Sequence, residues 1–249
     1  MLCKRTVLVL ALLTLGGLLQ RTRLAAQDVG PESVLRAEEA TRPSLKSAGP
    51  RWWKGNLHTH SLWSDGQEFP EVIVDWYKGN GYHFLPLSDH NVLSAGRLYI
   101  AVGEQTETHY PDFETNVVSR ETFARYLQCF GPDWVERRQS EERHLVRLKS
   151  LSEFRHRFEE PNRFMLIQSE EITDKFELAG VHVNATNILE PIPPQGGAGV
   201  VEVMQNNIDA VLEQRERTGR PMFPHLNHPN MGWSITAENI LEVRGERFF

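Results

Sequence analysis

Two short segments of the chain contain residue types that bind metal ions. His58 and His60 end a short apolar run, and Asp65 follows in a turn marked by Ser-Asp-Gly. Side chains two residues apart share a face of a strand, so both imidazoles can chelate one ion. Further along, Asp89 and His90 end a second apolar segment and would arrive from a second strand. The two segments together predict the first half of a metal site.

Each of these residues also has a simpler interpretation. His58 and His60 could belong to a half-exposed polar strand, and Asp65 could be an ordinary turn residue before glycine. Asp89 could cap a loop, but a carboxylate beside His90 also suits the orientation of an imidazole. We therefore take His90 as the ligand and Asp89 as the group that supports it.

Glutamates and one further histidine extend the set. Glu170 and Glu171 follow an apolar run, and neighbouring residues of a strand face opposite sides, so only one of them can face the site. His182 alternates with apolar neighbours in Gly-Val-His-Val-Asn, a pattern that suits a structural histidine as well as a ligand.

Two more histidines lie near the C-terminal end of the sequence. His225 and His228 flank Asn227, which could donate to a substrate oxygen, and Pro229 fixes the backbone after His228. Either histidine could be the ligand. The other would then be free to donate a proton to a leaving group.

The elements that must position these residues alternate between strands and helices. Apolar runs that end in polar, metal-type residues are typical of a βα barrel, which carries its active site at the C-terminal ends of its strands. Between residues 92 and 160 the alternation lapses, which predicts a helical insertion or lid with one charged helix over 133–159. The predicted strands are 53–58, 83–88, 163–168 and 180–187, and the other predicted helices are 71–78, 200–218 and 236–243.

The N-terminal segment has the plan of a secretory signal peptide. Two basic residues precede 14 apolar or small residues at 6–19, and small residues follow at Ala25 and Ala26. This apolar run is short for a membrane span. We expect a cleaved signal at 1–26, a linker at 27–50, one domain at 51–249, and a secreted or periplasmic protein without stable membrane association; an uncleaved membrane anchor is the alternative.

The charge and the cysteines of the chain exclude some classes of function. Cleavage would remove four basic and no acidic residues, so the formal charge of −6 would become −10. An acidic chain gains little from counterion release on a polyanion, so we expect no nucleic-acid partner. Cys129 would be the only cysteine left, which predicts no intrachain disulfide.

These residues resemble the motifs of the PHP (polymerase and histidinol phosphatase) domain family over about residues 51–249. The family's His-x-His with a nearby acid is matched by His58, His60 and Asp65, and its Asp-His by Asp89 and His90. Its Gly-x-Glu is matched by Ser169-Glu170-Glu171, with serine in place of the glycine. Its His-Pro is matched by His228-Pro229, and an intervening histidine by His182. The resemblance favours Glu171 over Glu170 and His228 over His225 as ligands, which leaves His225 as the proton donor. The family's final Asp-x-His is absent, so we expect the parent protein to supply those ligands after residue 249.

The resemblance implies a distorted βα barrel, related to the TIM barrel, that holds up to three divalent ions (zinc, manganese or iron). It implies hydrolysis of a small-molecule phosphate ester, in which a metal-bound hydroxide attacks phosphorus. Two alternatives remain at this stage. One is a metallohydrolase acting on an amide, a carbamate or a carboxylate ester, and the other is a noncatalytic metal-containing binding module.

Overall fold

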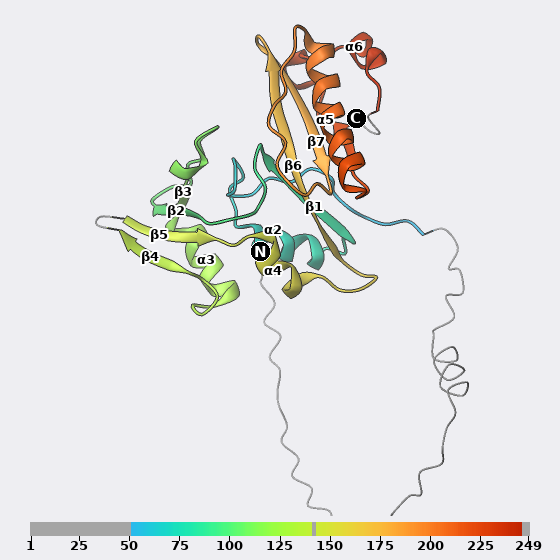
Figure 1. Ribbon diagram of the computed structural model, residues 1–249. Helices are drawn as coiled ribbons and strands as arrows, with labels where there is room; N and C mark the ends of the chain where they lie inside the picture. The colour runs from blue at the N-terminus through green and yellow to red at the C-terminus, as the bar shows by residue number, and fades with distance from the viewer. Residues whose placement is uncertain (1–50, 141–142, 246–249) are drawn as a thin grey trace, which may run out of the picture. The chain divides into compact units, whose positions relative to one another are not determined.

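The computed structural model describes residues 51–140 and 143–245. The predicted signal peptide and linker lie outside the described residues. The elements follow the order α2 (Pro70–Gly79), β1 (Phe84–His90), β2 (Leu98–Gly103), η1 (Phe113–Thr115), β3 (Val117–Ser119), α3 (Arg120–Phe130), β4 (Arg137–Ser140), β5 (Arg143–Leu148), α4 (Leu151–Phe158), β6 (Met165–Phe176), β7 (Ala179–Thr186), α5 (Val200–Thr218), β8 (Phe223–Leu226), η2 (Met231–Trp233) and α6 (Ala237–Glu242) (Figure 1). No helix among these elements is long and apolar enough to cross a membrane.

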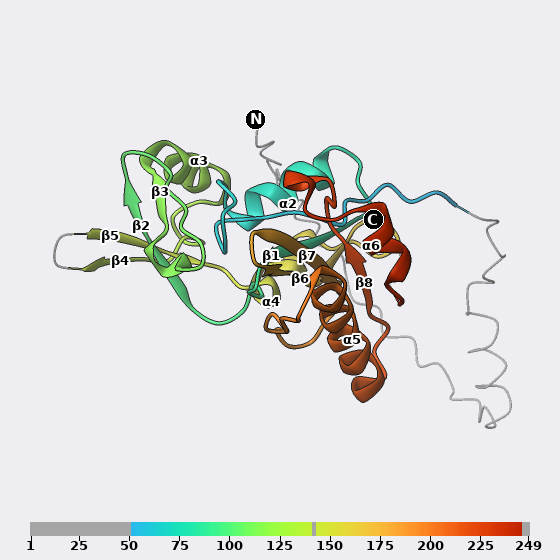
Figure 2. The same cartoon turned by 90° about the horizontal axis from the view of Figure 1, so that it is seen from above.

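The first sheet has the strand order β1-β6-β7-β8. β1 and β6 are parallel, whereas β7 is antiparallel to both β6 and β8. The long helix α5 packs along β6 and β7, as both views show (Figures 1 and 2). Its buried residues, which include Val203, Met204 and Ile208, form a hydrophobic core with Val181 and Val183 of β7. One face of the sheet is therefore covered, and the opposite face can carry polar groups.

The predicted βα barrel is wrong. The described residues form two mixed sheets of four strands each and no closed barrel. A βα barrel needs a helical crossover between parallel strands, but β6 runs directly into antiparallel β7 through Glu177 and Leu178. The predicted strand over 53–58 is also absent as a regular strand, since this segment forms only one parallel bridge, from Gly55 to Phe84.

The second sheet, with the order β3-β2-β5-β4, lies within the predicted insertion. The single helix predicted over 133–159 is wrong, because this segment contains β4, β5 and, after Ser150, helix α4. Val146 and Leu148 of β5 are completely buried and pair with β2, so tertiary packing decides the conformation of this charged segment. Ser150 then starts α4 with a capping box that includes Glu153.

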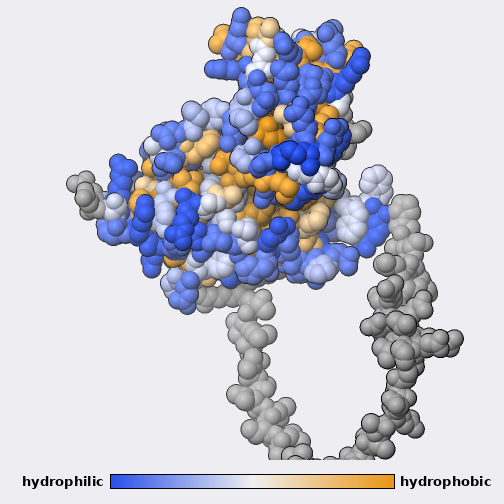
Figure 3. Space-filling view, viewed as in Figure 1, coloured by the Kyte–Doolittle hydropathy of each residue, from blue (hydrophilic) through white to orange (hydrophobic). Residues whose placement is uncertain are grey.

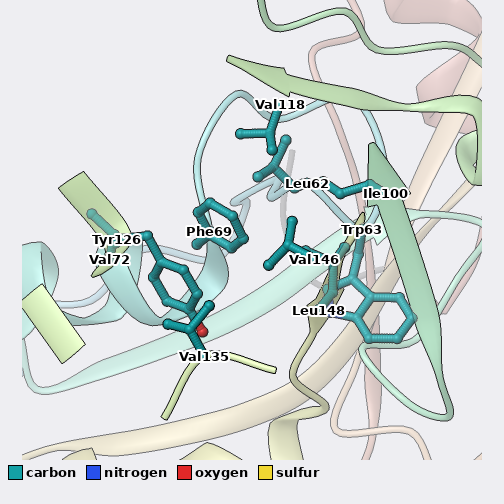
Figure 4. Close-up of a cluster of buried hydrophobic side chains, with 10 residues drawn as sticks. All are labelled: Leu62, Trp63, Phe69, Val72, Ile100, Val118, Tyr126, Val135, Val146 and Leu148. Carbon is teal, nitrogen blue, oxygen red and sulfur yellow. The ribbon is translucent and has the colours of Figure 1, made fainter. Parts of the chain in front are cut away.

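One hydrophobic core joins this second sheet to the segment that follows His60. The residues in Figure 4 come from the 62–72 segment and from the insertion, and they are Leu62, Trp63, Phe69, Val72, Ile100, Val118, Tyr126, Val135, Val146 and Leu148. The rings of Phe69 and Tyr126 stack with centroids 3.9 Å apart. The insertion is therefore packed against the segment that carries part of the predicted site.

Hydrophobic residues also reach the surface between the polar ones in Figure 3. Trp53 and Met165 are 46% and 53% exposed. They line a groove of about 680 Å³ together with Phe84 and Phe164, near the first residues of β1 and β6. None of the predicted metal ligands lines this groove, so it is separate from the predicted site.

The core that contains Phe69 and Tyr126 also contains a buried carboxyl group, that of Glu71 in the first turn of α2. Its Oε1 accepts hydrogen bonds from the Tyr126 hydroxyl at 2.5 Å and from Trp134 Nε1 at 3.0 Å. Its Oε2 is buried without a hydrogen-bond partner. Burial raises the pKa of Glu71 because the charged form loses its hydration, and the two hydrogen bonds offset this only in part.

Glu71→Gln should make the protein more stable than the wild type at neutral pH. Because the pKa of Glu71 is raised in the folded protein, its protonated carboxyl contributes stability that is fully present below the unfolded pKa near 4.5. This contribution is lost as the pH rises through the folded pKa. Glutamine keeps an acceptor at Oε1 and does not ionise. Denaturant unfolding from acid to alkaline pH should show an advantage of the variant that grows with pH, and a pH-independent difference would contradict this account.

Candidate metal centre

The face of the first sheet opposite α5 carries a row of polar residues. The strand register places His90, Glu171, Asn184 and His225 opposite one another on β1, β6, β7 and β8. Side chains on a strand alternate between faces, so these four residues share one face. His182 lies two residues before Asn184 and therefore shares this face too. Glu171 and His182 thus lie within their strands and not at the ends.

Glu171 is the centre of this row and is completely buried. Its Oε1 lies 3.2 Å from His182 Nδ1, 3.1 Å from His228 Nε2 and 3.6 Å from His58 Nε2. Asn227 Nδ2 also donates a hydrogen bond to this oxygen, at 2.7 Å. One carboxylate oxygen is thus surrounded by nitrogen atoms from three separate parts of the chain.

The second oxygen of Glu171 has close neighbours but no hydrogen bond. Glu171 Oε2 lies 2.9 Å from His90 Nδ1 and 3.1 Å from His60 Nε2. This oxygen is nevertheless buried and has no hydrogen-bond partner among the residues that the structure describes. A buried carboxylate oxygen normally accepts hydrogen bonds. Nitrogen and oxygen atoms that approach without hydrogen-bond geometry are expected where each points at a common cation, so these residues fit a bound metal ion.

Asp65 extends the cluster outward and is 45% exposed. Its Oδ1 lies 2.6 Å from His60 Nδ1, and its Oδ2 lies 3.4 Å from His90 Nε2. His60 in turn lies close to His58, with their Nε2 atoms 2.7 Å apart. Three overlapping groups have ligand atoms within 4.8 Å of one another and could hold a metal ion: His58-His60-Glu171, His60-Asp65-His90 and His90-Glu171-His182.

The carboxylates and the imidazoles of the cluster stabilise each other's charged forms. Burial lowers the pKa of His60 and His90, but the nearby carboxylates of Asp65 and Glu171 outweigh it and raise the two pKa values to about 10 and about 9. Burial opposes the charged form of Glu171, yet the nearby imidazoles of His182, His228, His60 and His90 hold its pKa well below its usual range. Hydrogen bonds with His60 and His90 lower the pKa of Asp65. A metal ion must displace protons from these imidazoles, so metal binding weakens in acid.

Asp89 binds the segment that carries His60 and Asp65. Its buried carboxylate accepts hydrogen bonds from Ser61 N at 2.7 Å, Ser61 Oγ at 2.9 Å and Ser64 Oγ at 2.7 Å. Burial raises the pKa of Asp89, while these bonds lower it. We predicted that Asp89 orients the imidazole of His90, but among the described residues its hydrogen bonds go to Ser61 and Ser64 in the turn after His60.

The structure brings Glu171, and not Glu170, into the histidine cluster. Glu170 is completely buried on the opposite face, where its Oε1 accepts a hydrogen bond from Ile192 N at 2.5 Å. Burial raises the pKa of Glu170 to about 8. The alternation of a strand thus separates the two glutamates, as the sequence required, and the choice of Glu171 agrees with the geometry.

His225 and His228 have different surroundings. His228 contacts Glu171 directly, whereas His225 is 6% exposed and its Nδ1 has no hydrogen-bond partner. Burial lowers the pKa of His225 to about 4, so its imidazole is neutral at pH 7 and is a proton acceptor before it is a donor. Its role as a proton donor stays a prediction. Asn227 is buried and donates to Glu171 and Asn184, so it positions the carboxylate.

Several supporting residues were not identified from the sequence. Thr173 Oγ1 bonds with His90 Nδ1 at 2.5 Å, and Asn184 Nδ2 donates to Leu57 O at 2.6 Å, next to His58. The period-two spacing of Thr173 after Glu171 and of Asn184 after His182 was the available signal. Tyr110 comes from the insertion, and its ring lies edge-on to His90 with centroids 5.4 Å apart. No local pattern indicated that contact.

Comparison with known proteins adds no family to this description. No protein-family model matches the chain, and no curated protein matches its sequence. The resemblance to the PHP family therefore rests on the motif residues alone and stays a prediction.

Proposed function

We propose that this chain is a metal-dependent hydrolase, and specifically a phosphoesterase of the PHP type. The observation that carries the proposal is the buried Glu171 carboxylate, which has five imidazoles around it and one oxygen without a hydrogen bond. Such a cluster of imidazoles and carboxylates is suited to borderline divalent ions such as zinc, manganese or iron. A purely structural network would be expected to satisfy both oxygens of a buried carboxylate.

The overlap between the three candidate groups supports more than one ion. Glu171, His60 and His90 each belong to two of the groups, and the shared carboxylate has one oxygen toward His58 and the other toward His90. Bound divalent ions would lower the pKa of a water molecule and neutralise charge on phosphoryl oxygens. Asp65 and His228 are the most exposed members of the cluster, so a substrate would approach from their side.

The proposal also includes export of the protein and a small-molecule phosphate ester as its substrate. The N-terminal pattern of basic, apolar and small residues supports export. The acidic charge of the chain supports a small substrate, because a nucleic acid would be repelled away from bound ions.

His60→Ala should lower metal content and phosphoesterase activity together. His60 belongs to two of the three candidate groups and contacts both Asp65 and Glu171. The loss of a direct ligand should weaken metal binding by about 100-fold or more, beyond the 10–100-fold typical of outer-shell partners. Elemental analysis of the purified protein and a panel of phosphate esters give the two measurements.

His156→Ala is the matched control, since His156 is exposed on α4 and lies outside the cluster. It should keep both metal and activity. Retained metal and normal turnover in His60→Ala would rule out the ligand role. Bound metal with hydrolysis of amides, carbamates or carboxylate esters, but not of phosphate esters, would identify a different hydrolase. Bound metal without any hydrolysis would identify a noncatalytic metal-containing module.

A further inference from the structure

The loop of residues 108–116, which we call the Tyr110 loop, is fixed to the segment that carries His60 and Asp65. Asn116 is completely buried where this loop ends. Its Nδ2 donates to Ser64 O at 2.6 Å, and its Oδ1 accepts a hydrogen bond from His109 N at 2.7 Å. A buried side-chain amide that bonds to both segments holds them together. The insertion therefore places the Tyr110 loop at the metal centre.

Tyr110 lies directly beside the cluster. Its ring packs edge-on against His90, and its hydroxyl oxygen accepts a hydrogen bond from Asn91 Nδ2 at 2.9 Å. Asn91 is itself fixed, because its Oδ1 accepts a hydrogen bond from Thr173 N at 2.8 Å. Its φ of 50° lies in the left-handed region that asparagine tolerates better than most residues. The phenol is thus held in place by the two residues that adjoin His90 in sequence and in space.

The hydroxyl proton of Tyr110 is available to a ligand. Asn91 supplies the hydrogen of the bond that the phenol oxygen accepts, so the phenol keeps its own hydrogen for donation. That hydrogen is donated to Thr173 O at 3.5 Å, which is at the limit for a hydrogen bond. Tyr110 is also half-exposed. A ligand oxygen at the cluster could therefore replace this long contact without breaking a strong one.

We propose that Tyr110 contacts the substrate and that its hydroxyl donates a hydrogen bond to an anionic oxygen of a tetrahedral phosphate group bound at the cluster. The inference rests on the proposed function and deepens it. It assigns to the insertion a part in substrate recognition, because the imidazoles and Asp65 belong to the candidate ion sites and the amide of Asn227 already donates to Glu171 and Asn184. A neutral donor beside the candidate ion sites suits a phosphate oxygen whose negative charge is not neutralised by a bound ion.

Tyr110→Phe tests this inference in the full chain loaded with zinc. The change removes one hydroxyl and keeps the ring against His90, so metal content measured by elemental analysis should equal that of the wild type. Titration calorimetry with inorganic phosphate should show binding about tenfold weaker, as expected for a lost hydrogen bond to a charged group. With phosphate esters, the same loss should appear in kcat/KM.

Tyr99→Phe is the matched control, because the Tyr99 hydroxyl belongs to the same insertion but bonds to Glu136. It should bind phosphate as the wild type does. Equal phosphate binding by Tyr110→Phe and the wild type would overturn the inference, and so would a zinc-loaded wild type that does not bind phosphate. Phosphate binding that weakens only in Tyr110→Phe, together with no ester hydrolysis by the wild type, would uphold the inference and refute the proposed phosphoesterase.

Discussion

Glu171→Gln should abolish tight metal binding while the chain still folds. Glu171 is the only carboxylate that contacts all five histidines of the cluster among the described residues. An amide is a weak ligand and leaves the imidazoles without their buried negative partner. Removal of one member of a buried charge pair costs about 3–5 kcal/mol, and a loss of that size in metal binding is a weakening of about 150- to 4,000-fold. Metal affinity measured by competition with a chelator should show this loss.

Glu170→Gln is a closely matched control for this experiment. The two residues are neighbours in β6 and equally buried, and the substitution is the same. Glu170 faces away from the histidines, and glutamine can still accept the hydrogen bond from Ile192 N. This variant should bind metal as the wild type does. If Glu170→Gln lost metal and Glu171→Gln kept it, the assignment of the faces of β6 would be wrong.

The helices of the first sheet were predictable because their signals are local. Residues 71–78 and 200–218 show the period of an amphipathic helix, and the structure confirms helices α2 and α5 at these places. Gly219, with a φ of 66°, ends α5 in the left-handed conformation that glycine adopts readily. Periodicity and a capping glycine act over a few residues, so the sequence alone can reveal them.

The direction of the strands was not predictable in the same way. β6 and β7 form a tight hairpin, in which Glu177 and Leu178 connect the paired residues Phe176 and Ala179. Glu177 has a φ of 53°, a conformation for which hairpins usually employ asparagine or glycine. The turn therefore lacked its usual signal, and an apolar run reads the same whether its neighbour is parallel or antiparallel. The barrel expectation failed for this reason.

The metal-type residues were easier to find than the residues that support them. His58 and His60 are spaced by two, and Glu171 is singled out from Glu170 by the resemblance, so short motifs sufficed. Tyr110 and Asn116 lie in an insertion whose fold was predicted incorrectly, and their contacts with the site exist only in the folded chain. Residue types and spacing thus indicate which groups can bind an ion, whereas tertiary packing determines which groups position them.

Asp89→Ala should destabilise the protein and weaken metal binding, although none of the hydrogen bonds that Asp89 makes within the described residues goes to an imidazole. Ser61 and Ser64 are completely buried and donate three hydrogen bonds to its carboxylate. Each buried donor that is left without an acceptor costs about 1–3 kcal/mol. Alanine also removes the unfavourable burial of the carboxylate, which offsets part of this loss of stability. We expect the free energy of unfolding to fall by about 3 kcal/mol, as measured by denaturant unfolding of the metal-free protein.

The loss of metal affinity in Asp89→Ala should follow from movement of the turn that carries Asp65. Ser61 adjoins His60 and Ser64 adjoins Asp65, so their bonds to Asp89 fix both His60 and Asp65 relative to His90. Asp133→Ala is the control, because Asp133 is exposed and remote in sequence from these groups; it should change neither quantity. Excess metal should restore part of the stability of Asp89→Ala, since an ion that binds only the folded state stabilises it by mass action. Wild-type stability together with wild-type metal affinity in Asp89→Ala would show that the serines hold the turn without it.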